Sequence, residues 1–197
     1  MPGLLDARVL VVNQKAKLIE LTNEYKISDG EGQPLGAVRE VGQGKARKLL
    51  RFVSNVDQFL THRFEVTDDS GQIVLTVTRP RKVFKSTVVV SDAGGTEIGR
   101  AVQQNVIGKI RFGLEANGQT VGQLSAENWR AWNFRIDDAD GTEVARINKK
   151  WAGLGRELFT TADHYAVEIH RPLEDPLRSL VLAAALTVDT ALKQDDN

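Results

Sequence analysis

The sequence of 197 residues has no cysteine and no net charge. The lack of cysteine excludes disulfide bonds, zinc sites with thiolate ligands and cysteine nucleophiles, and it is compatible with a reducing compartment. Because 26 basic residues balance 26 acidic ones, we expect no overall attraction to nucleic acid or to a membrane. Any charge-driven binding must therefore use local patches. No apolar run reaches the roughly 18 residues of a membrane-spanning helix.

Recognisable catalytic motifs are also missing. The sequence has neither a G-x-x-x-x-G-K-[ST] phosphate loop nor a G-x-S-x-G nucleophile motif. The stretches GQGKAR and GLGREL lack the third glycine of a dinucleotide fingerprint. The opening MPGLLDARVLVV has no apolar run of signal-peptide length, so we interpret it as mature sequence. We predict a cytoplasmic protein that is not an enzyme, needs no cofactor and binds no nucleic acid.

What the sequence does contain is one pattern, repeated five times. Each copy starts with an aromatic or β-branched residue, alternates apolar with polar residues, crosses an Asp/Asn/Gly turn and alternates again. The copies start at Tyr25, Phe64, Val88, Phe112 and Phe134. After the first gap they are 24, 24 and 22 residues apart, which fits a hairpin plus its connection. Two more strands, in VLVVNQKAKLIEL and HYAVEIH, bring the predicted total to about twelve.

The most apolar segment of the chain, DPLRSLVLAAALTVDTALKQ, completes the predicted fold. A barrel of about twelve strands is too wide for its own side chains to fill. Asp175 and Pro176 favour a helix start, and the apolar residues that follow surround the helix on all sides, as in a buried helix. The apolar centre, Leu180 to Leu186, is about 10 Å long, far short of a bilayer. Membrane insertion and partner binding are the alternatives for this segment.

We therefore predict a mainly β fold in a single domain, residues 1–197. A closed antiparallel β-barrel of about twelve strands surrounds a central hydrophobic C-terminal helix at about residues 176–193. Four segments follow one another along the chain, namely LVVNQKAKLIELTNEYKISDGEGQPLG, FEVTDDSGQIVLTVTRP, GGTEIGRAVQQN and DHYAVEIHRPLEDPLRSLVLAAALTVD. Their order and spacing resemble those of the phospholipid scramblases and the LURP-one-related proteins, in the tubby C-terminal-like superfamily. The cysteine cluster proposed as a lipidation site in animal scramblases is absent, so acyl anchoring is not implied.

Two basic segments, RPRKVFK and VREVGQGKARKLLR, are the candidate binding sites. Tubby domains bind phosphoinositide headgroups through basic side chains, and the resemblance implies a similar role here. The lipid-phosphate candidates are Arg79, Arg81, Lys82, Lys85, Lys45, Arg47 and Lys48. We predict binding to anionic phospholipid or to a membrane surface, as a peripheral protein at the inner face, with a protein as a further partner. A membrane-inserted phospholipid scramblase, a small-molecule or protein-binding scaffold, and plain solvated loops are the alternatives.

The resemblance also implies a calcium site, in an acidic segment before the last helix. The candidates here are Asp163, Glu168, Glu174 and Asp175, but Thr161 and His164 replace useful oxygen ligands. Calcium takes six to eight oxygens, so we expect no tight calcium site. His164, Glu168 and His170 share one face of HYAVEIH, and alternation explains them as the solvent-facing side of a strand rather than a metal site.

Two other patterns are explained by the fold. DDADG, at residues 137–141, has Ile136 and Ile147 where a calcium loop needs its first and twelfth ligands, so we interpret it as a turn. Trp132, Phe134 and Ile136 share a strand face, which is typical of a barrel core rather than of a base- or sugar-stacking surface.

Overall fold

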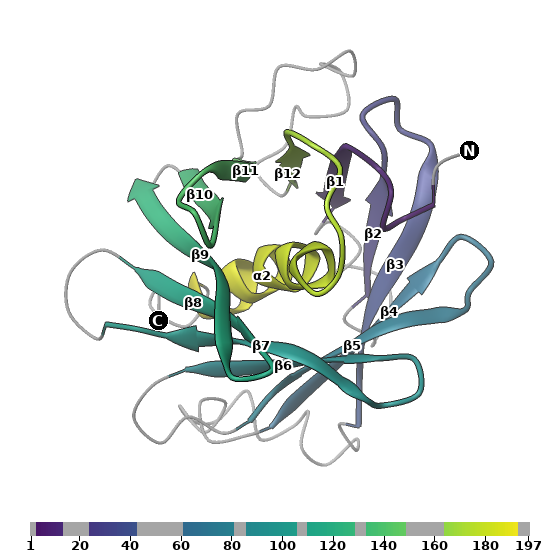
Figure 1. The fold of residues 1–197 in the computed structure, drawn as a ribbon. Helices are drawn as coiled ribbons and strands as arrows, with labels where there is room; N and C mark the ends of the chain where they lie inside the picture. Colours follow the sequence, from purple (N-terminus) through teal and green to yellow (C-terminus); the bar gives the residue numbers. More distant parts are fainter. Residues whose placement is uncertain are drawn as a thin grey trace.

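The computed structural model describes residues 3–13, 24–42, 61–80, 86–105, 110–128, 133–148 and 164–192. Within these residues, twelve antiparallel strands close into a barrel around one helix, α2 (Figure 1). The strands are β1 (Val9–Asn13), β2 (Glu24–Ser28), β3 (Pro34–Val41), β4 (His62–Asp68), β5 (Ile73–Arg79), β6 (Thr87–Asp92), β7 (Glu97–Gln103), β8 (Arg111–Ala116), β9 (Gln119–Asn128), β10 (Asn133–Asp138), β11 (Glu143–Asn148) and β12 (His164–Ile169). Each strand pairs with the next one in the chain, and β1 pairs with β12. The predicted barrel is confirmed.

Four of the five hairpins turn in the same way, which accounts for the repeat in the sequence. In each, an aspartate Oδ1 accepts a hydrogen bond from the backbone N–H four residues later. A glycine three residues after the aspartate has φ between 80° and 86°, a conformation that glycine adopts without steric cost. The register shifts beside each turn, as expected for a type I turn followed by a glycine bulge. The aspartates are Asp29, Asp68, Asp92 and Asp138.

The two ends of the barrel differ because the strands alternate in direction. All five hairpin turns and the start of α2 lie at one end, which we call the turn end. The fifth turn, between β8 and β9, uses Asn117 and Gly118 with φ of 51° and 75°. At the opposite end, which we call the far end, the strands β1, β3, β5, β7, β9 and β11 finish. Each of the predicted basic segments therefore begins at the far end.

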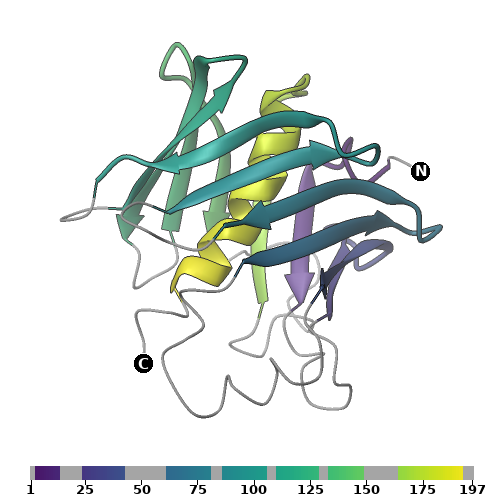
Figure 2. The same cartoon turned by 90° about the horizontal axis from the view of Figure 1, so that it is seen from below.

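Helix α2 (Leu177–Leu192) occupies the interior of the barrel (Figure 2). Asp175 Oδ1 accepts hydrogen bonds from the backbone N–H of Ser179 at 3.2 Å and from its Oγ–H at 2.7 Å, which satisfies the first turn. Every residue from Ser179 to Val188 is buried, so the helix is enclosed on all sides. The predicted central helix is confirmed. No helix within the described residues has the length and apolarity needed to cross a bilayer.

Glycines in the barrel wall make room for the helix. A Cβ atom on Gly99 of β7 would lie 2.4 Å from the carbonyl oxygen of Glu115 and 3.2 Å from Cδ1 of Leu180 in α2. A Cβ atom on Gly122 of β9 would likewise lie 3.0 Å from Cδ1 of Leu177. Helix leucines therefore pack against the wall where it has no side chain.

Most of the remaining interior side chains are apolar, and they include one of the aromatic strand faces seen in the sequence. Phe134 and Ile136 of β10 are fully buried, as predicted for core residues. Trp132 lies outside the described residues. DDADG forms the turn between β10 and β11, as expected, with the N–H of Asp138 donating to the carbonyl of Thr142.

Candidate functional site

The structure describes one of the seven predicted lipid-phosphate residues. Six of them lie outside the described residues, namely Arg81, Lys82, Lys85, Lys45, Arg47 and Lys48, as does the calcium candidate Asp163. The described strands that flank the two basic segments are neighbours in the barrel, in the order β3, β4, β5 and β6. The chain therefore enters both segments at the same side of the far end.

Arg79, the seventh residue, faces the interior. It shares the inner face of β5 with Leu75 and Val77, and it is only 9% exposed. His62 lies directly opposite on β4, and its Nδ1 is 2.6 Å from Oε1 of Glu40 on β3. The side chains of His62 and Glu40 are 2% and 5% exposed. We call Glu40, His62 and Arg79 the inner polar cluster.

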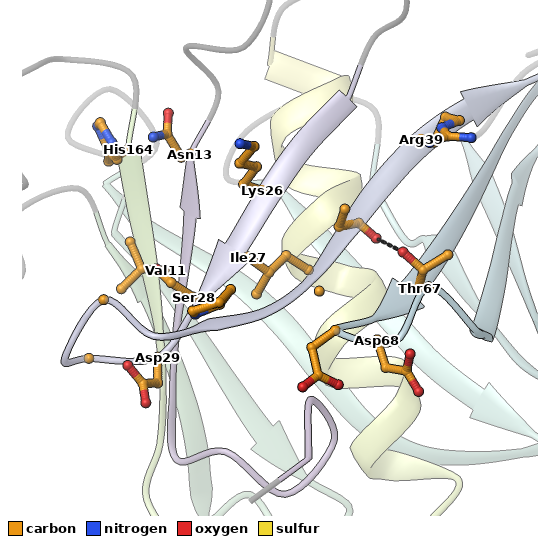
Figure 3. Close-up of a pocket in the computed structure, with 17 residues that line it drawn as sticks. Val11, Asn13, Lys26, Ile27, Ser28, Asp29, Arg39, Thr67, Asp68 and His164 are labelled. Carbon is orange, nitrogen blue, oxygen red and sulfur yellow. Dashed lines mark hydrogen bonds between the residues drawn. The ribbon is translucent and has the colours of Figure 1, made fainter. Parts of the chain in front are cut away.

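A hollow of about 630 Å³ opens on the outer surface of β1 to β4 and the start of β12 (Figure 3). We call it the outer groove. Strand register brings five of its residues into one row across five strands. In strand order from β12 through β1 to β4, the row is His164, Asn13, Lys26, Ala37 and Thr67. The floor of the groove includes three residues with small side chains or none, Ser28, Gly36 and Ala37.

The outer groove carries opposite charges toward its two ends. Lys26 and Arg39 lie toward the far end, and both side chains are exposed (Figure 3). Within the described residues, Lys26 makes no hydrogen bond or ion pair. Asp29, Asp68 and Asp69 line the groove at the turn end. The pKa of Asp68 is lowered because its carboxylate accepts hydrogen bonds from the Ser70 hydroxyl and nearby backbone N–H groups, so this residue is ionised at neutral pH.

The outer face of β9 to β11 offers a contrast, because its charges are paired with one another. Arg146 donates to Glu127 Oε2 at 2.8 Å through Nη1 and to Glu143 Oε1 at 2.8 Å through Nε. These hydrogen bonds from Arg146 lower the pKa values of both glutamates. Arg135 is likewise bonded to Asp137. This outer ion-pair network is internally compensated, whereas Lys26 has no such partner in the part of the chain that the structure describes.

The remaining metal candidates have other partners or lie apart. Glu168 Oε1 accepts a hydrogen bond from Asn148 Nδ2 at 3.3 Å. Asp175 accepts from Arg178 and Ser179 at the start of α2, and Glu174 is exposed. In the part of the chain that the structure describes, no group of three His, Asp or Glu residues is placed to hold a metal ion.

One detail of β12 differs from the prediction. His164 lies on the outer face, as the alternation requires, but it is 8% exposed rather than open to solvent. Ala166, on the same face, is 1% exposed. Alternation correctly gave the face of the sheet, but a position on the outer face of a barrel is not always in water.

The chain matches known proteins over most of its length. A family model described as Scramblase matches residues 3–192. The chain belongs to the Scramblase family. It is 25% identical over 173 residues to the altered inheritance rate of mitochondria protein 25 of Saccharomyces cerevisiae, covering 75% of this chain and 52% of that protein. It is 26% identical over 181 residues to a phospholipid scramblase family protein of Schizosaccharomyces pombe, covering 83% and 46%.

This Scramblase-family chain thus spans about half the length of those two curated relatives. It is also 19% identical over 201 residues to human phospholipid scramblase family member 5, covering 92% of this chain and 72% of that protein. An X-ray structure of an Arabidopsis thaliana protein superposes with a TM-score of 0.54 and 10% sequence identity, covering 94% of each chain. That likeness shows the fold alone. The predicted family and the predicted architecture, a closed barrel of twelve strands around a C-terminal helix, are both confirmed.

Sequence reasoning missed the outer groove. Lys26 stands in YKISDG as an ordinary polar position of a strand, and Arg39, although it lies in the basic segment VREVGQGKARKLLR, was not among the predicted phosphate-binding residues. The D-x-x-G repeat was the available signal, because it places Asp29 and Asp68 at the same end of neighbouring hairpins.

Proposed function

We propose that this Scramblase-family barrel is a non-enzymatic protein that binds phospholipid headgroups at an anionic membrane surface. The observation that carries the proposal is Lys26, an exposed cation in the outer groove that has no partner within the described residues. Arg39 is exposed in the same groove. Lysine and arginine side chains bind phosphate through charge-assisted hydrogen bonds.

The position of the groove on the barrel supports this function. Arg39 belongs to β3 and lies toward the far end, where the chain enters the two basic segments that contain Lys45, Arg47 and Lys48, and Arg81, Lys82 and Lys85. Cations near an anionic membrane contribute about 1 kcal/mol each. Lys26 and Arg39 together therefore supply about 2 kcal/mol, or roughly a thirtyfold change in affinity.

Vesicle flotation tests the proposal. The protein is mixed with phosphatidylcholine vesicles that contain phosphatidylglycerol or a phosphoinositide, and we expect it to float with them at low ionic strength. Changing Lys26 and Arg39 together to Gln should weaken binding by roughly thirtyfold. The control is Arg111→Gln, which removes an exposed cation on β8, four strands from β4. A second variant, with Arg81, Lys82 and Lys85 changed to Glu, tests the basic segment separately.

Two results would contradict the proposal. The wild-type protein could remain unbound in the presence of every anionic vesicle. Alternatively, the Lys26 and Arg39 double variant could float as well as Arg111→Gln does, which would remove the groove from the binding surface. Circular dichroism of each variant verifies that the β-barrel is intact before the comparison is made.

A further inference from the structure

We propose that the outer groove distinguishes phospholipid headgroups by their ammonium group, and prefers a primary ammonium, as in ethanolamine, to the trimethylammonium of choline. This inference rests on the proposed function, since it requires that the groove binds headgroups. It adds a selectivity that the cations of the groove alone cannot provide.

The spacing of charge along the groove suits a zwitterion. Lys26 and Asp29 are three residues apart on β2 and its turn, which corresponds to about 10 Å along the backbone. On the neighbouring strands, Arg39 lies opposite Glu65, and Asp68 is three residues further along β4. The long side chains of Lys26 and Arg39 can lean inward over the small residues of the floor. A phospholipid headgroup whose phosphate binds these cations then has its ammonium group toward the carboxylates at the turn end.

The carboxylates at the turn end are held in place and retain free oxygen atoms. Asp29 Oδ1 accepts the backbone N–H groups of Glu31 and Gln33 at 2.9 and 2.8 Å. Asp68 uses its Oδ1 in the same way. Within the described residues, Oδ2 of both aspartates and the whole carboxylate of Asp69 make no hydrogen bond. Oδ1 thus anchors the carboxylates of Asp29 and Asp68 at the turn end of the groove, and Oδ2 of each is available to accept from a cation there.

The composition of the groove favours a primary ammonium. An –NH₃⁺ group donates three hydrogen bonds, which carboxylate oxygens accept. A trimethylammonium group has no N–H to donate, and proteins recognise it through the faces of aromatic rings. The described residues that line the groove include no Phe, Tyr or Trp. The available chemistry therefore matches ethanolamine better than choline.

A neighbouring part of the barrel shows that the acidic turns alone do not make this site. Asp92 forms the same turn as Asp68 in the next hairpin. The outward positions of β5 and β6 beside it are Thr76, Thr78, Val89 and Ser91, none of which carries a positive charge. Exposed cations beside the other turns already have partners, as Arg100 on β7 has in Glu97 and Arg171 has in Asp138, whereas Lys26 makes no hydrogen bond or ion pair within the described residues. Asp92 is therefore a matched control.

The experiment measures binding to two vesicle types of equal surface charge. Both contain the same fraction of phosphatidylglycerol, and the remainder is phosphatidylcholine in one and a mixture with phosphatidylethanolamine in the other. We expect the wild-type protein to bind the ethanolamine vesicles about fivefold more tightly, the upper range for exposed ion pairs. The double variant Asp29→Asn with Asp69→Asn should lose this preference, because asparagine keeps the Oδ1 acceptor of the turn and removes the charge. Asp92→Asn should keep it.

The sign of the effect on choline vesicles provides a second readout. Removing two negative charges should leave binding to those vesicles unchanged or stronger, because the attraction to the anionic surface increases. Altered lipid packing in ethanolamine vesicles acts on all variants alike, so the comparison between variants isolates the groove. Equal binding of the wild-type protein to both vesicle types, or a preference that survives in the double variant, overturns this inference and leaves the proposed function standing. Failure to bind any anionic vesicle overturns both.

Discussion

Replacing Gly99 with alanine tests how closely the barrel wall fits the central helix. The added Cβ would lie 2.4 Å from the carbonyl oxygen of Glu115 on β8 and 3.2 Å from Cδ1 of Leu180 in α2. The carbonyl oxygen belongs to the backbone of a paired strand, so relief requires β7 and β8 to move apart. Overpacking of this kind costs about 1–3 kcal/mol. For a chain of this length each kcal/mol lowers Tm by roughly 2–4 °C, which gives a loss of roughly 2–12 °C.

Urea unfolding followed by tryptophan fluorescence and circular dichroism measures this loss. The matched control is Gly94→Ala in the turn of the same hairpin, where the residue is exposed and a Cβ would approach only the Asp92 side chain, at 3.3 Å from Oδ1. The free energy of unfolding should change there by at most about 0.5 kcal/mol. Leu180→Ala alone should cost about 2–5 kcal/mol, because it leaves a cavity in the core. Because Leu180 contacts the new methyl group, the double variant Gly99→Ala with Leu180→Ala should lose less free energy of unfolding than the two single variants lose together. The difference should be about 0.5 kcal/mol or more. A wild-type-like Gly99→Ala, or strictly additive losses, would refute the packing of α2 against β7.

Two further predictions concern ionisable groups. Glu40→Gln should lower the free energy of unfolding by about 1–3 kcal/mol, because it weakens the 2.6 Å contact with buried His62. The control Glu65→Gln, on the outer face of β4, should change the free energy of unfolding by at most about 0.5 kcal/mol. Equal effects of the two substitutions would contradict the burial of the inner polar cluster. The pKa values of Glu127 and Glu143 lie below their ordinary 4.5 in the folded protein, so the stabilisation that they provide is complete above about pH 4.5 and is lost as the pH falls below it. Arg146→Gln should therefore make the acid-side decline in the free energy of unfolding shallower, and an unchanged slope between pH 7 and pH 3 would count against the network.

The sequence was sufficient to predict the barrel because its signals are local and repeated. Alternation assigns each strand a buried face, and the D-x-x-G turns join the strands in pairs. The helix was predictable for a different reason. Residues 179–188 are apolar with few exceptions, and no single stripe of a surface helix would account for that.

The candidate site was not predictable, because it depends on pairing between distant strands. Lys26, Asn13 and His164 share a row only through the register of β2, β1 and β12. Nothing local in the sequence specifies that register. Arg79 was assigned to a basic segment by its neighbours in sequence, although its alternation with Leu75 and Val77 already indicated the inner face.

The pairing of β1 with β12 has a consequence for how the chain folds during its synthesis. Val9 pairs with Glu168, so the ring of strands cannot be joined until the ribosome has released almost all of the domain. The helix that fills the ring emerges later still. Until then, the apolar inner faces of the nascent strands are exposed to water, and such contacts between distant residues form slowly. Until the ring closes, this exposed apolar surface makes the unfinished chain prone to aggregation.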